Sequence, residues 1–290
     1  MWKKALHTSA FTPHKFSIPT SHAISLSLAS TMLSGRLAIV TGATSGIGMA
    51  TAKHFVKEGA KVVGVGRNKA ALAALQKETG CGVAEADITA PGACERAVAE
   101  AVSHLGGLTT LINCAGVLMP GAIGTTASLK DFEHNFAGNT RSVFEMMEHS
   151  IPHLKERSAD GSCSIVNISS VNGLQSFGGV ATYCAAKAAV DMLTKCAALD
   201  LAPFGIRANA VNPGLVLTEL QKRGGLNDEQ YAALVQRSLE VTHPLFQSRG
   251  RAPDPSEVAD LIAFLASDKA LFVTGDSIKI DGGRTCVGAR

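Results

Sequence analysis

The chain has 290 residues, of which 46% are hydrophobic and 18% are charged, and its formal net charge is +3. This length suits one large globular domain or two small ones, and the charge is too small to indicate a nucleic-acid-binding protein. No run of 18 apolar residues occurs, so a membrane-spanning helix is not expected. The seven cysteines form no C-x-x-C pair, which favours a reducing compartment over a disulfide framework or a thiolate metal site.

The first 31 residues differ from the rest of the chain. They carry Lys3, Lys4 and Lys15 and many Ser and Thr, but no Asp or Glu. An acid-free segment of this kind is typical of a transit peptide, although such peptides are usually rich in Arg and this one has none. An unstructured extension before a second start at Met32 is the alternative. We therefore expect an extension over 1–31 and one domain over 32–290, in the cytoplasm or, with a targeting extension, in an organelle such as the mitochondrion.

From Arg36 onward, short apolar runs alternate with helical patterns. The strands predicted from these runs cover residues 37–41, 61–66, 83–86, 108–113, 164–169, 207–211 and 276–280. The predicted helices cover residues 50–58, 68–78, 91–105, a long stretch within 129–154, 182–201 and 257–266. The section from Pro213 to about Pro255 shows no regular pattern and is expected to be irregular.

The apolar runs lack period-two alternation, which indicates strands buried on both faces. Alternation with helices then predicts an α/β fold with a doubly wound parallel sheet, the Rossmann fold, as a single domain of about seven strands with helices on both faces. In such sheets ligands bind beyond the carboxyl ends of the strands. The residues expected at those ends are Gly42–Gly48, Gly66-Arg67, Asp87, Asn113–Gly116, Ser169-Ser170 and Asn212–Gly214.

A glycine-rich turn, Thr41–Gly48, follows the first predicted strand and opens a helix. Glycines let a pyrophosphate approach the backbone at a helix N-terminus, where free N–H groups favour anions. The turn lacks Gly-Lys-Ser/Thr and is therefore not a P-loop. Its position between strand and helix predicts a dinucleotide site.

Tyr183 and Lys187 are four residues apart in an alanine-rich helical pattern, so they project from one face. A nearby ammonium favours the phenolate, so we expect Lys187 to lower the pKa of Tyr183 and make it a proton donor or acceptor. A solvated helix face is the alternative interpretation of this common spacing.

Together these motifs resemble the short-chain dehydrogenase/reductase family, in its compact single-domain branch. The family's Thr-Gly-x-x-x-Gly-x-Gly is similar to Thr41–Gly48, its Asn-Asn-Ala-Gly to Asn113–Gly116 with Cys114 in place of Asn, and its Tyr-x-x-x-Lys to Tyr183–Lys187. The family's serine 13 residues before the tyrosine falls on Ser170, and its Pro-Gly on Pro213-Gly214. The resemblance runs from about residue 34 to 283.

The resemblance implies hydride transfer with NAD(P), interconverting a ketone or aldehyde and an alcohol. Tyr183 would pass the proton, Lys187 would hold the nicotinamide ribose, Ser170 would bind the substrate oxygen, and Asn139 would order a relay water. Asn135 is a rival to Asn139 whose spacing from Phe144 fits the family pattern less well. The residues implied in coenzyme binding are Gly42, Thr44, Ser45, Gly46, Ile47, Gly48, Arg67, Asn68, Asp87, Ile88, Asn113, Ala115, Gly116, Tyr183, Lys187, Pro213, Gly214, Val216 and Thr218.

The end of the second strand bears on the choice of coenzyme. It reads Gly66-Arg67-Asn68, with no acidic residue to repel a 2′-phosphate, and Arg67 can contact a phosphate through two N–H groups. NADP(H) is therefore favoured. NAD(H) stays possible, because Ser45 stands where many NADP-preferring relatives carry a second basic residue.

The remaining expectations concern ligands and partners. His149 and His153 are four apart, but with Pro152 between them and no third ligand they favour a solvated face, so no metal is expected. Apolar candidates for the pocket, such as Leu118, Phe177 and Leu215, suggest a moderately hydrophobic ketone, with core packing as the alternative. The resemblance implies a homodimer or homotetramer. The alternatives to an NADP(H)-dependent reductase are an NAD-dependent dehydrogenase of the same family and a non-catalytic dinucleotide-binding regulator on the same fold.

Overall fold

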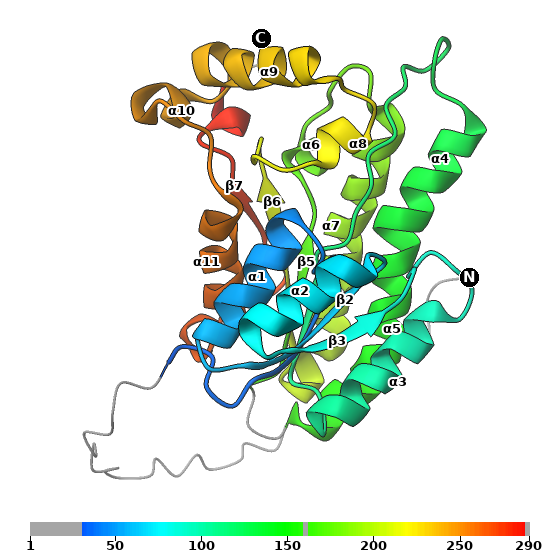
Figure 1. Cartoon of the computed structure of the whole chain (residues 1–290), viewed down its shortest axis with the longest axis vertical. Coiled ribbons are helices and arrows are strands. Elements are labelled where there is room, and N and C mark those ends of the chain that lie inside the picture. Colours follow the sequence, from blue (N-terminus) through cyan, green and yellow to red (C-terminus); the bar gives the residue numbers. More distant parts are fainter. Residues whose placement is uncertain (1–30, 159–161, 288–290) are drawn as a thin grey trace, which may run out of the picture. The chain divides into compact units, whose positions relative to one another are not determined.

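A computed structural model describes residues 31–158 and 162–287 of the chain. The expected N-terminal extension, apart from Thr31, lies outside these described residues. The fold is built on one parallel sheet of seven strands in the order β3-β2-β1-β4-β5-β6-β7 (Figure 1). The strands are β1 (Leu37–Thr41), β2 (Lys61–Gly66), β3 (Gly82–Glu85), β4 (Thr110–Asn113), β5 (Ser164–Ile168), β6 (Arg207–Pro213) and β7 (Ser277–Ile280).

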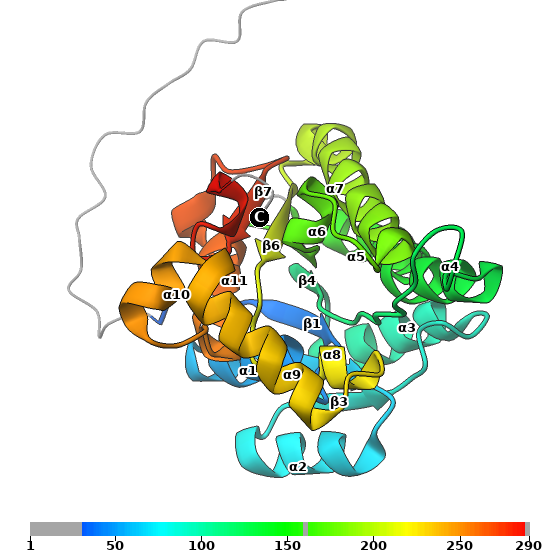
Figure 2. The same cartoon turned by 90° about the horizontal axis from the view of Figure 1, so that it is seen from above.

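Helices cover both faces of this sheet, as Figure 2 shows from above. One face packs on α1 (Gly46–Lys57), α2 (Lys69–Thr79) and α11 (Pro255–Ala266), and the other on α3 (Ala93–Leu105), α5 (Ser142–Glu156) and α7 (Ala181–Leu201). Successive side chains of β1 point to opposite faces, so Ile39 joins the core under α3, α5 and α7, whereas Val40 joins the core under α1 and α11. The predicted doubly wound parallel sheet is confirmed.

The long helix expected within residues 129–154 is interrupted. Helix α4 (Leu129–Phe136) has Ser128 as its N-cap, and the Ser128 side chain accepts a hydrogen bond from the Asp131 N–H. A π-helical turn, η1 (Ala137–Arg141), then separates α4 from α5. Single π-turns inside helices are rare, and those that do occur often lie at functional sites. Apolar periodicity alone does not reveal such an interruption, because the apolar positions continue on both sides of it.

The section expected to be irregular, up to about Pro255, contains helices instead. They are α8 (Leu220–Arg223), α9 (Asp228–Arg237), the π-turn η4 (Ser238–Thr242) and α10 (Pro244–Arg249). These elements lie over the carboxyl ends of the strands (Figure 1) and have a small core of their own around Leu215 and Phe246. Their short length and polar composition hide them from a periodicity search, although Asn227 and Gln230 form a capping box at the start of α9. We call residues 215–250 the lid.

Two short helices follow strands β5 and β7. A four-residue helix, α6 (Val171–Leu174), follows β5, and the 3-10 helix η6 (Arg284–Cys286) follows β7. Within the described residues, no helix is both long enough and apolar enough to cross a lipid bilayer.

Candidate active site

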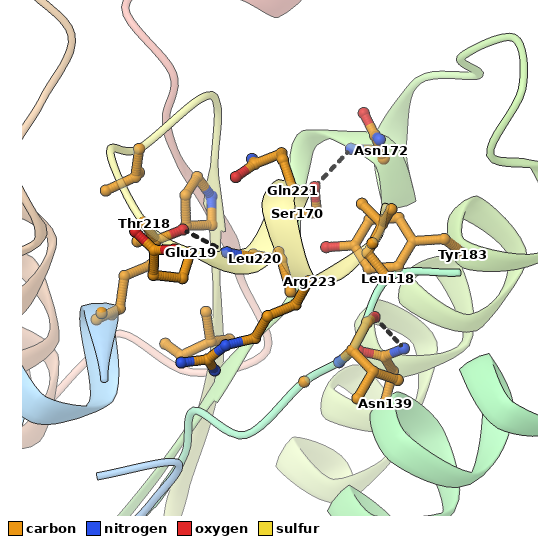
Figure 3. Close-up of a pocket in the computed structure, with 18 of the residues that line it drawn as sticks. Leu118, Asn139, Ser170, Asn172, Tyr183, Thr218, Glu219, Leu220, Gln221 and Arg223 are labelled. Carbon is orange, nitrogen blue, oxygen red and sulfur yellow. Dashed lines mark hydrogen bonds between the residues drawn. The ribbon is translucent and has the colours of Figure 1, made fainter. Parts of the chain in front are cut away.

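A cleft with a volume of about 720 Å³ opens at the carboxyl ends of the strands, beneath the lid. Its walls come from the glycine-rich turn, the loops after β2 to β6, helix α7 and the lid (Figure 3). All four expected catalytic residues, Asn139, Ser170, Tyr183 and Lys187, line this cleft, and they come from three separate segments of the chain.

The glycine-rich turn forms one end of the cleft and has no room for side chains. Gly42 has a φ of +69°, and a Cβ there would lie 2.9 Å from the Cα of Ala115. A Cβ on Gly48 would collide with the carbonyl oxygen of Gly42. Helix α1 starts here without an acidic residue in its first turn, and the side chain of its N-cap, Ser45, makes no capping bond. The first-turn N–H groups are therefore open to an anion, and the turn fits the diphosphate of a dinucleotide.

Arg67 and Asp87 stand together at the ends of β2 and β3. The Nη1 atom of Arg67 lies 3.7 Å from Oδ2 of Asp87, and most of the Arg67 side chain is exposed. Partial burial raises the pKa of Asp87, but hydrogen bonds from Thr89 and the charge of Arg67 outweigh it and hold the pKa below its usual value. Asp87 is thus an anion at neutral pH, and Arg67 keeps donors free to bind a ligand from the cleft.

The hydroxyl of Tyr183 faces Ser170 across the cleft (Figure 3). Ser170 caps helix α6, where its Oγ accepts a hydrogen bond from the Asn172 N–H at 3.1 Å. Burial raises the pKa of Tyr183 to about 12, although hydrogen bonding to Ser170 opposes the rise. The expectation that the pKa of Tyr183 is lowered is therefore wrong for this structure, because desolvation of the phenolate outweighs its hydrogen bond with Ser170.

Lys187 is buried one helical turn after Tyr183. Its Nζ donates a hydrogen bond of 2.8 Å to the carbonyl oxygen of Ile168 and lies 5.8 Å from the centroid of the Tyr183 ring. Burial lowers the pKa of Lys187 to about 8, while Cys114 and Asp191 act in the opposite direction. At neutral pH the ammonium is mostly charged, and two of its three N–H groups stay available for other acceptors.

Asn139 lies in the π-turn η1 and is fully buried. Its amide nitrogen donates to the carbonyl oxygens of Val117 and Asn135, and its Oδ1 accepts from the Val117 N–H at 3.1 Å. The side chain therefore fastens the loop after β4 to the π-turn. The rival Asn135 makes equivalent bonds to Met119 and Thr182, but it does not line the cleft.

Seventeen of the nineteen residues expected to bind coenzyme line the cleft. The exceptions are Asn68 and Asn113. Asn68 caps helix α2 by accepting a bond from the Ala71 N–H, as capping asparagines commonly do. Asn113 is buried in the sheet, where its Nδ2 donates to Asn167 at 2.9 Å and its Oδ1 has no partner.

His243 belongs to no sequence motif, yet it is buried in the lid wall of the cleft. Its Nε2 accepts from the Leu215 N–H at 3.3 Å, so its Nδ1 donates to Thr242. Burial, with help from Arg284, lowers the pKa of His243 to about 4. A Cβ on Gly214 would lie 2.9 Å from this Nε2, which explains the glycine after Pro213.

Asp191 is a second buried polar residue without a sequence signal. It lies four residues after Lys187, and its carboxylate accepts hydrogen bonds from Asn212 and Ser277. Burial raises the pKa of Asp191, while these bonds, the side chain of Ser169 and the charge of Lys187 oppose the rise. A Cβ on Gly173 would collide with this carboxylate, so the small residue in α6 leaves room for it.

Comparison with known proteins identifies this architecture. The family model described as enoyl-(acyl carrier protein) reductase matches residues 42–285. A 2,5-dichloro-2,5-cyclohexadiene-1,4-diol dehydrogenase of Sphingobium indicum is 36% identical over 256 residues, which cover 87% of this chain and 96% of that protein. A 3-alpha-(or 20-beta)-hydroxysteroid dehydrogenase of Mycobacterium bovis is 35% identical over 87% of this chain and 90% of its own. An L-fucose dehydrogenase of Rattus norvegicus is 32% identical over 86% and 89%, respectively.

A solved structure is similar as well. The crystal structure of a short-chain dehydrogenase/reductase of unknown function from Caenorhabditis elegans, determined with cofactor, has a TM-score of 0.81 and 31% sequence identity. It covers 89% of this chain, which in turn covers 98% of that chain. The fold and the cleft define a dinucleotide-binding oxidoreductase. The chain belongs to the short-chain dehydrogenase/reductase family, whose members bind NAD(P).

Proposed function

We propose that the protein interconverts a carbonyl compound and an alcohol, with Tyr183 as the proton donor or acceptor. The observation that carries this proposal is the pairing of the Tyr183 and Ser170 hydroxyls at the cleft, with the Lys187 ammonium buried one helical turn away. Two hydroxyls that converge on one point can bind a single oxygen atom of a substrate. A non-catalytic regulator has no chemical need for this arrangement.

The raised pKa of Tyr183 keeps its proton on the phenol at neutral pH, where it is available to a substrate oxygen. At neutral pH the phenol is protonated, so both Tyr183 and Ser170 can donate hydrogen bonds to a carbonyl oxygen. A nicotinamide coenzyme held in the cleft would supply or accept the hydride. In the reductive direction Tyr183 gives its proton to the substrate oxygen, and the nearby Lys187 ammonium stabilises the phenolate that remains.

We favour NADP(H) as the coenzyme. Arg67 is largely exposed at the end of β2, and no acidic residue stands within Gly66-Arg67-Asn68 to repel a 2′-phosphate. The ion pair with Asp87, at 3.7 Å, is long enough for a phosphate to compete for the same guanidinium. NAD(H) is the alternative for the same cleft.

The substrate end of the cleft has a mixed lining. Leu118, Phe177 and Leu215 contribute apolar walls, and Leu226 and Leu234 of the lid extend them. This lining supports a moderately hydrophobic ketone or secondary alcohol. The relatives named for a cyclic diol, a steroid and a sugar define the range of alcohols to be examined.

Oxidation of NADPH and NADH with a panel of steroid, sugar, quinone and acyl-thioester carbonyls tests the proposal, together with the reverse reaction on the matching alcohols. We expect turnover of at least one carbonyl, with a higher kcat/KM for NADPH than for NADH. Binding of coenzyme without turnover of any panel member would contradict the proposal, as would turnover confined to the C=C bond of an enoyl thioester.

A further inference from the structure

An arginine of the lid reaches the glycine-rich turn. Arg223 is the last residue of α8, and its Nη1 donates a hydrogen bond of 3.1 Å to Oγ of Ser45, which is 178 residues away in sequence. Figure 3 shows the side chain extended away from α8. The lid is close to the turn at a second point, because a Cβ on Gly46 would lie 3.1 Å from the methyl carbon of Thr218.

The charge of Arg223 has no acidic partner at this place. Among the described residues, the Ser45 hydroxyl is the one hydrogen-bond partner of the Arg223 guanidinium, and no ion pair involves it. The neighbouring Lys222 differs, since its Nζ lies 2.7 Å from Oδ1 of Asp228 and it does not line the cleft. A guanidinium that uses one of its five donors has four left for a ligand.

The glycine-rich turn that Arg223 contacts has no cationic side chain of its own. Thr41–Gly48 contains no basic residue, and α1 has none in its first turn, so backbone N–H groups supply the positive end of this site. Arg67 lies at the end of the neighbouring strand β2 and is engaged with Asp87. The lid therefore brings to the turn a cationic side chain that the turn itself lacks.

We propose that Arg223 is a coenzyme-binding residue carried by the lid, and that its guanidinium binds a phosphate group of NAD(P) over Ser45. This inference rests on the coenzyme binding of the proposed function but not on its substrate or its proton transfer. Guanidinium–phosphate bonds are charge-assisted and among the stronger hydrogen bonds in proteins. Since Leu226 and Leu234 of the lid also line the cleft, coenzyme bound by Arg223 holds the substrate wall in place.

Substitution Arg223→Gln tests the proposal by calorimetric titration with NADPH and with NADH, in the absence of any substrate. We expect the Kd to rise roughly tenfold, because a charge-assisted contact is lost. Lys222→Gln is the matched control, since it removes the same charge from the adjacent position and should leave both Kd values unchanged. Arg223→Lys, which keeps the charge but loses the planar fork, should give an intermediate Kd.

The two coenzymes identify which phosphate is bound. An equal loss of affinity for NADPH and NADH assigns the contact to the diphosphate, which both contain, and a loss for NADPH alone assigns it to the 2′-phosphate. Unchanged Kd values for both coenzymes in Arg223→Gln would overturn the proposal. These titrations are independent of turnover, so they stand whether or not a substrate is found.

Hydrogen exchange of the lid gives a second readout. In the wild-type protein, NADPH should slow amide exchange over residues 220–249, because the coenzyme ties the lid to the turn. Each variant is given NADPH at the same multiple of its own Kd. Exchange of the lid amides should then slow less in Arg223→Gln than in Lys222→Gln. Equal protection of the lid in both variants would contradict the proposed link between the coenzyme and the lid.

Discussion

Burial distinguishes Tyr183 from an ordinary surface tyrosine. Its side chain is 5% exposed, and loss of solvent raises its pKa to about 12. The spacing of Tyr183 and Lys187 predicted that they share a face, and both do line the cleft. Spacing could not predict the pKa, because the pKa depends on how deeply the folded chain buries the phenol. The same limit applies to His243, whose low pKa comes from burial among segments remote in sequence.

Local chemistry explains which residues could be predicted. Glycine turns and strand ends have sequence signals, so the positions of Gly42, Gly48 and Ser170 at the cleft follow from the order of the elements. Asn68 and Asn113 also stand at strand ends, but Asn68 caps helix α2 through a local hydrogen bond, and Asn113 bonds Asn167 on the neighbouring strand. Arg223 had no signal, because its partner Ser45 is 178 residues away.

Arg67 gives a prediction about the choice of coenzyme. Arg67→Gln should raise the KM for NADPH by about tenfold or more and leave the KM for NADH nearly unchanged, because only NADPH carries the 2′-phosphate. Steady-state kinetics with both coenzymes measure the ratio. Lys69→Gln is the control, since Lys69 is a cation two residues away that does not line the cleft. An equal rise for both coenzymes would argue against a 2′-phosphate contact.

Among the elements, the π-turn η1 and the lid depart furthest from the predicted pattern. In η1 the side chain of Asn139 bonds backbone groups of Val117 and Asn135, so the turn and the loop after β4 fix each other. The role of Asn139 in ordering a relay water stays a prediction. The lid helices were not predicted, because each is short and packs on a small core that forms only when Leu215, Phe246 and Ala252 meet.

The lid also carries a prediction about pH and stability. The pKa of His243 is about 4 in the folded protein against an ordinary value of 6.5. Between these values the unfolded chain takes up a proton that the folded protein does not, so the free energy of unfolding falls as the pH drops from 6.5 toward 4. At pH 5 the loss due to this residue should be on the order of 1–2 kcal/mol.

Urea unfolding at pH 7.5 and pH 5.0 measures this effect. His243→Gln should lose less stability than the wild-type protein over this interval, because glutamine does not titrate. If both proteins showed the same difference between the two pH values, His243 would not be a neutral, buried group in the folded state.

At the scale of the whole domain, the sheet order explains why its ends form one site. All seven strands are parallel, so the glycine-rich turn after β1, the loop after β4 and Ser170 after β5 meet at one edge. The parallel sheet with helices on both faces was predicted, because apolar runs that alternate with helices have few other solutions. Helix bounds shifted by a few residues, as at α1, which begins at Gly46 rather than Ala50.

The outer faces of α4, α5 and α7 support the expected homo-oligomer. Large apolar side chains are exposed on them, namely Leu129, Phe132, Phe144, Met192 and Leu199. An exposed apolar surface of this kind commonly marks a subunit interface. Sedimentation should therefore show a species larger than one chain, and Phe144→Asp with Leu199→Asp should dissociate it.

The control for this experiment is Ile123→Asp, which changes another exposed apolar residue outside these helices. It should leave the assembly intact. A wild-type protein that sediments as a single chain at micromolar concentration would contradict the expectation.

The most direct test of the central claim is the rate of coenzyme oxidation in a single turnover, compared between the wild-type protein and Tyr183→Phe. The substitution removes the phenolic hydroxyl and keeps the buried ring, so coenzyme affinity should change little. We predict that the rate constant falls by about 10²–10⁴-fold, the usual contribution of general acid catalysis. An unchanged rate constant, with coenzyme bound equally well by both proteins, would contradict proton transfer by Tyr183.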